Sequence, residues 1–307
     1  MIANFFNKSK PVNVFITTLL LLLLYVFSNF GQNSVAFSLS FLIKKIVLFF
    51  IVVFFFLILK FIIEKNKLTK DNSYASLLGV FLLGAFSEVF FSNEVLFSNL
   101  ILMLSFRKIY SLRSGINTKL KLFDAAFWIG ISTIIYSWSI LYLILIYVGI
   151  IVYRKLNLKN LLIPVIGFST PILIYFTYNF YVDDLTIFYS AFNYSVNLNF
   201  INYNSLKFLI PITVLITVLL WSLVLVTPKI ILVSNHLKSS WSVILNHLMI
   251  GIVVVILSPI KNGSEIFYII FPSVIIITNF LQKSKSKTFK NLILYLFLIL
   301  AISVYFL

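Results

Sequence analysis

The chain has 307 residues, of which 61% are hydrophobic and 10% are charged, and its mean hydropathy is +1.09. Globular domains carry about 25% charged residues, so this composition excludes a soluble domain and indicates a membrane protein. The formal net charge of +16 lies mostly in short loops between apolar segments, which favours contacts with anionic lipids over nucleic-acid binding. The chain has no cysteine, which excludes disulfides, thiolate metal sites and cysteine nucleophiles.

Apolar segments long enough to span a membrane follow one another along the chain. A helix that crosses the hydrocarbon core needs about 20 mostly apolar residues. Simple candidates are residues 13–30, 41–63, 161–181, 206–227, 241–258, 265–281 and 291–307.

Two further apolar regions, 74–106 and 123–153, are flanked by basic loops at both ends, so each must cross the membrane and return. The polar stretches 87–94 and 137–139 are the predicted turns. Because the limbs of 123–153 are short, this region either crosses twice or forms a re-entrant hairpin buried in protein. The sequence predicts one all-α transmembrane bundle of eleven spans that comprises residues 1–307.

Positive charge alternates between successive loops. Six basic loops hold 20 of the 24 Lys and Arg residues: 8–10, 60–70, 107–121, 154–159, 229–238 and 283–290. Cytoplasmic loops carry this excess, so we expect a bacterial inner-membrane protein with its amino terminus in the cytoplasm and its carboxyl terminus outside. Only Lys44, Lys45, Lys207 and Lys261 fall outside these loops, and Lys44 and Lys45 begin the second span from the outer side.

The longest predicted outer loop covers residues 182–205. Apolar residues recur in it at helical spacing, at Leu185, Phe188, Tyr189, Phe192 and Val196. Asp183 or Asp184 would cap the start of such a helix. The spacing predicts a short helix over 184–196 that lies in the outer membrane interface.

Five of the eight acids are predicted to face outward: Glu88, Glu94, Asp183, Asp184 and Glu265. Glu88 lies at the hydrocarbon edge, where it either serves a function or ends a helix and reaches water. Glu265 and Lys261 would either hold a ligand or form a solvated ion pair at a turn.

The remaining polar candidates are few. Lys44 and Lys45 would hold a phosphate or extend to lipid headgroups. His236 and His247 lie far from acidic clusters and are read as a loop residue and a residue near the start of a helix, so we expect no metal site and no cofactor.

The layout resembles the membrane half of GT-C glycosyltransferases, which use polyprenyl-phosphate sugars. The resemblance rests on the hairpin with outer acids, the paired limbs around 130–138, the long outer loop and the segment Ser264-Glu265-Ile-Phe-Tyr-Ile-Ile-Phe-Pro272. It implies Glu88 or Glu94 as general base and Lys44, Lys45 or Lys261 as phosphate ligands. Glu265, Asp183 and Asp184 would contact the substrate. The chain is also similar to eleven-span bacterial inner-membrane proteins that carry no assigned activity.

The first predicted outer loop, 31–43, lacks the acid that GT-C enzymes usually need there. An inactive relative therefore remains an alternative, as do a non-catalytic subunit that scaffolds other envelope membrane proteins and, third, a transporter. For a ligand, the sequence predicts an outward-opening cavity between the third, fourth and tenth spans, with Glu88 near its floor and Glu265 on its rim. A closed bundle is the alternative.

Overall fold

The computed structural model describes residues 1–30, 39–233 and 235–307, and within these ranges the chain forms helices and no strand. The α-helices are α1 (Ile2–Phe5), α2 (Pro11–Phe30), α3 (Leu39–Asn66), α4 (Tyr74–Ala85), α5 (Asn93–Ser111), α6 (Thr118–Ile135), α7 (Leu143–Val152), α8 (Leu158–Tyr181), α9 (Leu185–Ala191), α10 (Leu206–Val233), α11 (Asn235–Leu257), α12 (Phe267–Lys283) and α13 (Lys287–Ser303). Short 3-10 turns are η1 (Ser87–Phe91), η2 (Leu112–Ser114), η3 (Ser137–Tyr142), η4 (Ile201–Asn204) and η5 (Ser264–Ile266).

Seven helices in the described ranges are long and apolar enough to cross a membrane: α2, α3, α5, α8, α10, α11 and α12. Shorter apolar helices cover Tyr74–Ala85 and Ser137–Val152. These helices make the chain a multi-pass membrane protein, which confirms the class expected from composition. The count of eleven crossings stays a prediction.

Helices α4 and α5 are separated at the first polar stretch that the sequence singled out. The α-helix stops after Ala85, η1 covers Ser87–Phe91, and α5 begins at Asn93. The second polar stretch likewise separates α6 from α7, because η3 begins at Ser137. Both long apolar regions therefore form two helices each.

Polar side chains cap several helix starts. At α8 the side-chain oxygen of Asn157 accepts the backbone N–H of Asn160 at 2.7 Å, and at α13 Ser286 accepts that of Phe289 at 3.3 Å. Each cap satisfies a backbone donor that lacks a partner in the first helical turn.

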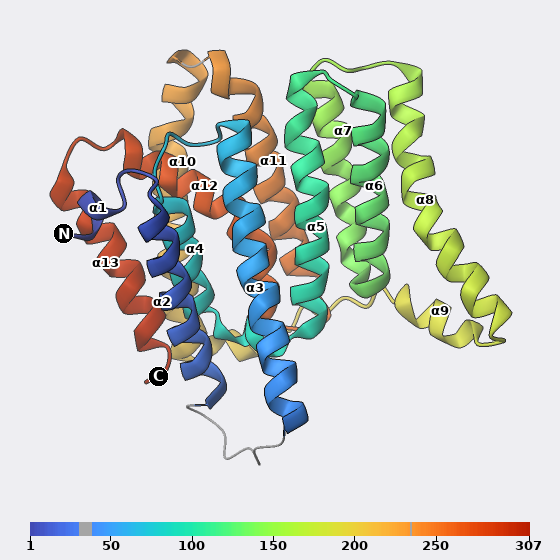
Figure 1. The fold of residues 1–307 in the computed structure, drawn as a ribbon, viewed down its shortest axis with the longest axis horizontal. Helices are drawn as coiled ribbons and strands as arrows, with labels where there is room; N and C mark the ends of the chain where they lie inside the picture. The colour runs from blue at the N-terminus through green and yellow to red at the C-terminus, as the bar shows by residue number, and fades with distance from the viewer. Residues whose placement is uncertain (31–38, 234) are drawn as a thin grey trace.

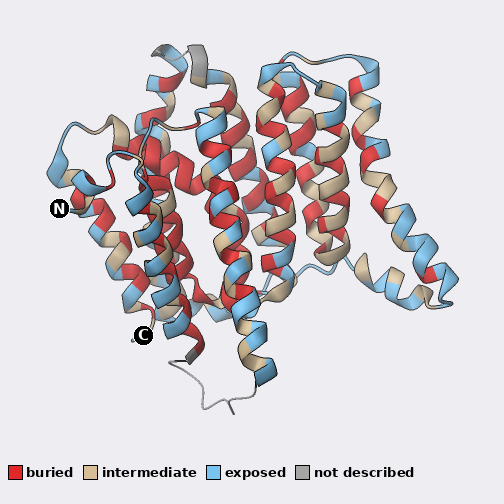
Figure 2. Cartoon of the chain, in the orientation of Figure 1, coloured by how far each residue is buried: buried red, intermediate tan, exposed pale blue. Residues whose placement is uncertain are grey.

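Helix α12 is at the centre of the bundle, and α8 is at its edge. Helix α12 contacts α4, α10 and α11, and Figure 2 shows it almost wholly buried. Helix α8 contacts mainly α6 and leads away from the bundle into α9 at the lower right of Figure 1.

Basic and acidic residues gather at opposite ends of the bundle. The connections α3–α4, α5–α6 and α7–α8 lie together at the top of Figure 1, whereas α9 lies at the bottom. The top, called the basic end, has the basic loops 67–73, 112–117 and 153–157. The bottom, called the acidic end, has Glu88, Glu94, Asp183, Asp184 and Glu265.

The helix predicted over 184–196 is shorter than expected, because α9 ends at Ala191. The asparagines that follow compete for the backbone donors: Asn193 accepts the N–H of Ser195 at 3.1 Å, and Asn197 accepts that of Asn199 at 2.9 Å. Side-chain bonds two residues onward favour turns over helix. Residues 31–38 of the first predicted outer loop lie outside the described ranges.

Candidate functional site

A hollow of about 370 Å³ opens at the acidic end between α5, α6 and α8; it is called the acidic-end hollow. Its polar lining comes from Glu94 on α5, Tyr136 and Ser137 between α6 and η3, Tyr175 on α8, and Ser190, Asn193 and Ser195 on and after α9. No Lys or Arg belongs to the described lining. The hollow combines one carboxylate with hydroxyl and amide groups.

Two glycines bring α6 and α8 close together above this hollow. A Cβ atom at Gly167 would lie 2.6 Å from the carbonyl oxygen of Phe123, and one at Gly130 would lie 2.5 Å from Cγ of Pro171. Small residues allow membrane helices to pack closely in this way. Nearer the acidic end the larger Ile134 and Tyr175 line the hollow.

Helix α9 and the segment after it are fastened to η3. Ser137 Oγ donates to the carbonyl oxygen of Asn193 at 2.8 Å, and Trp138 Nε1 donates to that of Ser195 at 3.1 Å. The rings of Trp138 and Tyr194 also meet edge to face, with centroids 5.7 Å apart. These contacts hold the segment against η3, where Asn193 and Ser195 line the hollow.

Glu94 lies in the first turn of α5, is exposed, and forms no ion pair within the described part of the chain. Tyr136 beside it is buried, and its hydroxyl donates to Ser258 Oγ at 2.6 Å. The hollow thus presents a carboxylate acceptor beside a buried phenol that Ser258 engages.

Glu88 occupies another part of the acidic end, where its carboxylate pairs with the ammonium group of Lys207 on α10. Lys45 lies over the rings of Phe41 and Phe91, at 5.5 and 5.1 Å from their centroids, and Lys44 is exposed. None of these groups lines the acidic-end hollow. The structure therefore separates Glu88 from Glu94, the two acids that the resemblance treats alike.

Lys261 and Glu265 are both buried, at 3% and 0% exposure, and no ion pair joins them. The Lys261 ammonium group donates to the carbonyl oxygens of Val255 and, at 2.8 Å, of Ile256, which end α11. Burial lowers the pKa of Lys261 to about 8. The solvated ion pair between Lys261 and Glu265, one of the two arrangements expected from the sequence, is therefore not formed.

Among the described residues, Glu265 is a buried acid whose carboxylate has neither an ion pair nor a hydrogen-bond partner. Backbone N–H groups of Asn262, Gly263 and Glu265 itself lie near its carboxylate, but neither oxygen accepts a hydrogen bond of normal geometry.

Asp183 and Asp184 form the turn between α8 and α9. Asp183 has a left-handed φ of 57°, and Asp184 accepts the backbone N–H of Ile187 at 3.4 Å as the predicted cap. Neither aspartate lines the acidic-end hollow. Their observed contacts shape the chain reversal that positions α9.

A buried polar cluster that the sequence analysis did not predict lies in the core. His247, read as a residue near the start of a helix, lies inside α11, where Tyr110 makes a 3.1 Å hydrogen bond to its Nδ1. Phe106, Tyr142 and Phe271 surround its ring. Ser98 joins Ser132, Ser139 and the Tyr268 hydroxyl at 2.8 to 2.9 Å. The helix starts before the expected residue, which places His247 deeper than predicted. The side chain of His236 lies outside the described residues.

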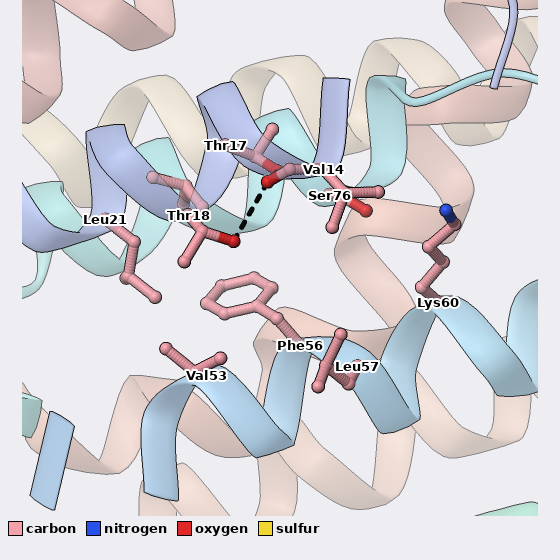
Figure 3. A pocket seen from close by; sticks show the side chains of 10 residues that line it. Val14, Thr17, Thr18, Leu21, Val53, Phe56, Leu57, Lys60 and Ser76 are labelled. Carbon is pink, nitrogen blue, oxygen red and sulfur yellow. Dashed lines mark hydrogen bonds between the residues drawn. The ribbon is translucent and has the colours of Figure 1, made fainter. Parts of the chain in front are cut away.

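Another hollow lies between α2, α3 and α4 (Figure 3). Phe56 projects from α3 into it, and Lys60 stands at one end. Its volume is about 20 Å³, which suits a single water molecule and no larger ligand. This space is a packing defect of the bundle, and we assign no site to it.

The acidic-end hollow differs from the cavity that the sequence predicts. Its walls are α5, α6 and α8, whereas the expected walls were α4, α5 and α12, and neither Glu88 nor Glu265 lines it. Within the described ranges, no three His, Asp or Glu side chains gather as metal ligands would. Comparison with protein-family models, curated proteins and solved structures finds no match to this chain.

Proposed function

We propose that the protein crosses the bacterial inner membrane eleven times, with the basic end in the cytoplasm and the acidic end outside. The basic loops at one end support this orientation, since cytoplasmic loops carry the excess of Lys and Arg. In this arrangement the amino terminus is cytoplasmic, the carboxyl terminus is external, and residues 123–153 cross twice.

The cysteine-free chain allows a direct test of this topology. Asn197→Cys and Ser303→Cys should react with a membrane-impermeant maleimide in intact cells. Ser114→Cys and Ser286→Cys should react only after the cells are opened. Labelling of Ser286→Cys in intact cells would contradict the orientation.

We further propose that the protein is a GT-C-like transferase that acts on a lipid-linked sugar at the outer leaflet. The observation that carries this proposal is Glu94, an unpaired carboxylate in a hollow lined by hydroxyl and amide groups. Sugar hydroxyls pair with such groups, and ligand pockets combine concavity with a few converging polar groups. The lipid tail of the substrate would lie in the membrane beside α8.

In the proposed reaction the Glu94 carboxylate accepts the proton of the acceptor hydroxyl. The hydroxyl oxygen bonds to the anomeric carbon, and the bond from that carbon to the phosphate oxygen breaks, which releases polyprenyl phosphate. Because no cation among the described residues lines the hollow, the phosphate would lie outside it. Lys44 and Lys45, near the acidic end of α3, are the proposed phosphate contacts, whereas Lys261 is engaged by the end of α11.

The decisive experiment compares acid variants in membrane vesicles supplied with a polyprenyl-phosphate sugar and an acceptor. Glu94→Gln should lower the transfer rate about a hundredfold or more, the usual contribution of a general base. Asp71→Asn removes an acid at the basic end and should leave the rate unchanged. Glu88→Gln tests the other candidate acid. Normal transfer by Glu94→Gln, or loss only in Glu88→Gln, would contradict the assignment of Glu94.

A non-catalytic scaffold is the second candidate, and the exposure of α8 favours it. Only 17% of the apolar window of α8 is buried, so most of the helix is free for a partner helix in the membrane. If the protein is a scaffold or an inactive relative, the Glu94→Gln variant should restore a deletion strain completely. If it is a scaffold, variants with bulky polar substitutions on the exposed face of α8, such as Ile174→Gln, should fail to restore that strain.

A further inference from the structure

A second hollow of about 370 Å³ lies between α5 and α6 at the basic end; it is called the basic-end hollow. Arg107, Lys108 and Asp124 line its polar part, and Leu104, Phe127 and Trp128 line its apolar part. It lies at the opposite end of α5 from Glu94, so it is separate from the proposed transferase site.

The charges in the basic-end hollow leave one cation without a carboxylate. Lys108 and Asp124 form an ion pair at 2.6 Å that joins α5 to α6. The guanidinium group of Arg107 lies over the ring of Phe61, 5.0 Å from its centroid, and pairs with no described acid. Lys65 lies over the same ring at 5.2 Å. The hollow therefore has a net positive charge, because Asp124 offsets only one of its two lining cations.

The polar and apolar walls follow one another along the helix axis. Leu104 precedes Arg107 by about one turn, and Trp128 follows Asp124 by about one turn on the antiparallel α6. Both steps lead away from the basic end, so Leu104 and Trp128 lie deeper than the charged groups, while Phe123 lies beside Asp124. A phospholipid has the same order, with a phosphate at the surface and acyl chains below it.

We propose that the basic-end hollow binds the phosphate of an anionic phospholipid in the adjacent leaflet. The planar guanidinium of Arg107 donates two parallel hydrogen bonds to phosphate oxygens, a geometry that lysine does not provide. Lys108 remains paired with Asp124, and the glycerol and first acyl carbons pack on Leu104, Phe127 and Trp128. Basic pockets between membrane helices bind lipid headgroups by this chemistry.

Arginine is rare in this chain, so the presence of Arg107 in the basic-end hollow is informative. Among the 24 basic residues only Arg107, Arg113 and Arg154 are arginines. Arg107 alone of these lines the basic-end hollow. Arg154 is exposed at the same end and provides a matched control that has the same charge but does not line the hollow.

Native mass spectrometry of the full chain, purified from membranes of mixed phosphatidylglycerol and phosphatidylcholine, tests the proposal. The unmodified protein should retain phosphatidylglycerol in preference to phosphatidylcholine. Arg107→Gln should lower this preference about tenfold, the equivalent of one lost charge-assisted hydrogen bond. Arg107→Lys should give an intermediate loss, and Arg154→Gln should leave the preference unchanged. Monodisperse elution of each variant shows that it has folded.

Three outcomes would overturn the proposal. The first is an absence of preference in the unmodified protein. The second is an equal loss in Arg107→Gln and Arg154→Gln, which would assign the preference to general surface charge. The third is displacement of bound phosphatidylglycerol by inorganic phosphate, because the ligand would then be a free phosphate and not a lipid. Failure of the Glu94 experiment leaves this test unaffected.

Discussion

Helices α8 and α12 have the same mean hydropathy over their most apolar windows, but 94% of the α12 window is buried against 17% of the α8 window. Lipid tails and the protein interior are equally apolar, so hydropathy identifies a membrane helix without showing what covers it. Buried polar side chains do not separate the two helices either, since α12 buries Ser273, Thr278 and Asn279 and α8 buries Asn160 and Asn179. The difference lies in the neighbours: α12 contacts α4, α10 and α11, whereas α8 contacts mainly α6, through glycine.

The largest contrast is expected from matched Phe→Ala substitutions in the two helices. Phe271 on α12 is 2% exposed and lies against Phe106, Tyr110 and His247. Phe271→Ala should lower the free energy of unfolding by about 3 kcal/mol, because it leaves a cavity in the core. Phe180→Ala on α8, at a residue that is 62% exposed, should change it by less than about 0.5 kcal/mol. Thermal denaturation in detergent micelles measures both, and equal effects would remove the distinction.

A substitution at the α6–α8 contact should detach α8 without unfolding the core. Gly167→Val adds atoms where a Cβ already meets the Phe123 carbonyl oxygen at 2.6 Å. Cysteines at Ile134 and Tyr175, which line the same hollow, should cross-link through a short bifunctional maleimide in the otherwise unmodified chain. The added valine should lower this yield several-fold while the melting temperature changes little. A fall in melting temperature as large as that of Phe271→Ala would place α8 in the same cooperative unit as α12.

The loop before α12 should make stability depend on pH. Burial lowers the pKa of Lys261 to about 8, so above that pH the folded state binds fewer protons at this residue than the unfolded chain does. The free energy of unfolding should therefore rise as the pH increases from about 8 towards the ordinary pKa of lysine. Below pH 8 Lys261 should cause no such rise. Lys261→Gln should abolish this rise. An identical pH profile in both proteins would show that Lys261 is not desolvated.

The smallest effect is expected where α9 is fastened to η3. Trp138→Phe removes the 3.1 Å hydrogen bond to the Ser195 carbonyl oxygen and keeps an aromatic ring beside Tyr194. The loss of one hydrogen bond should cost about 1 kcal/mol locally. Hydrogen exchange should increase in residues 185–200 and remain unchanged in α12. A uniform increase across both regions would show that α9 is coupled to the core.

The helical architecture was predictable because its signals are local. Apolar length, basic loops and the polar breaks at 87–94 and 137–139 each lie within one segment, and helices α4 and α6 end at those breaks. The early end of α9 also has a local cause, the Asn193 and Asn197 turns, which helical spacing alone did not reveal.

The candidate site was less predictable because distant segments build it. Glu94 lines a hollow together with residues of α6 and α8, two helices that glycine contacts hold close together. The partner of Glu88 had a usable signal, since Lys207 is one of the four cations outside the basic loops. The depth of His247 depended on where α11 begins, and that start at Asn235 precedes the predicted residue 241.

The amino-terminal helix α1 is held by residues that are synthesised both early and late. The Tyr74 hydroxyl donates to the Ala3 carbonyl oxygen at 2.7 Å, and the Ala3 N–H donates to Asn291 at 2.9 Å, across 288 positions of the chain. A ribosome that adds about 5–20 residues per second needs roughly 15 to 60 s to cover that distance. During this interval α1 lacks its partner Asn291. A helix that is made well before α13 is therefore secured only after α13 has been added to the chain.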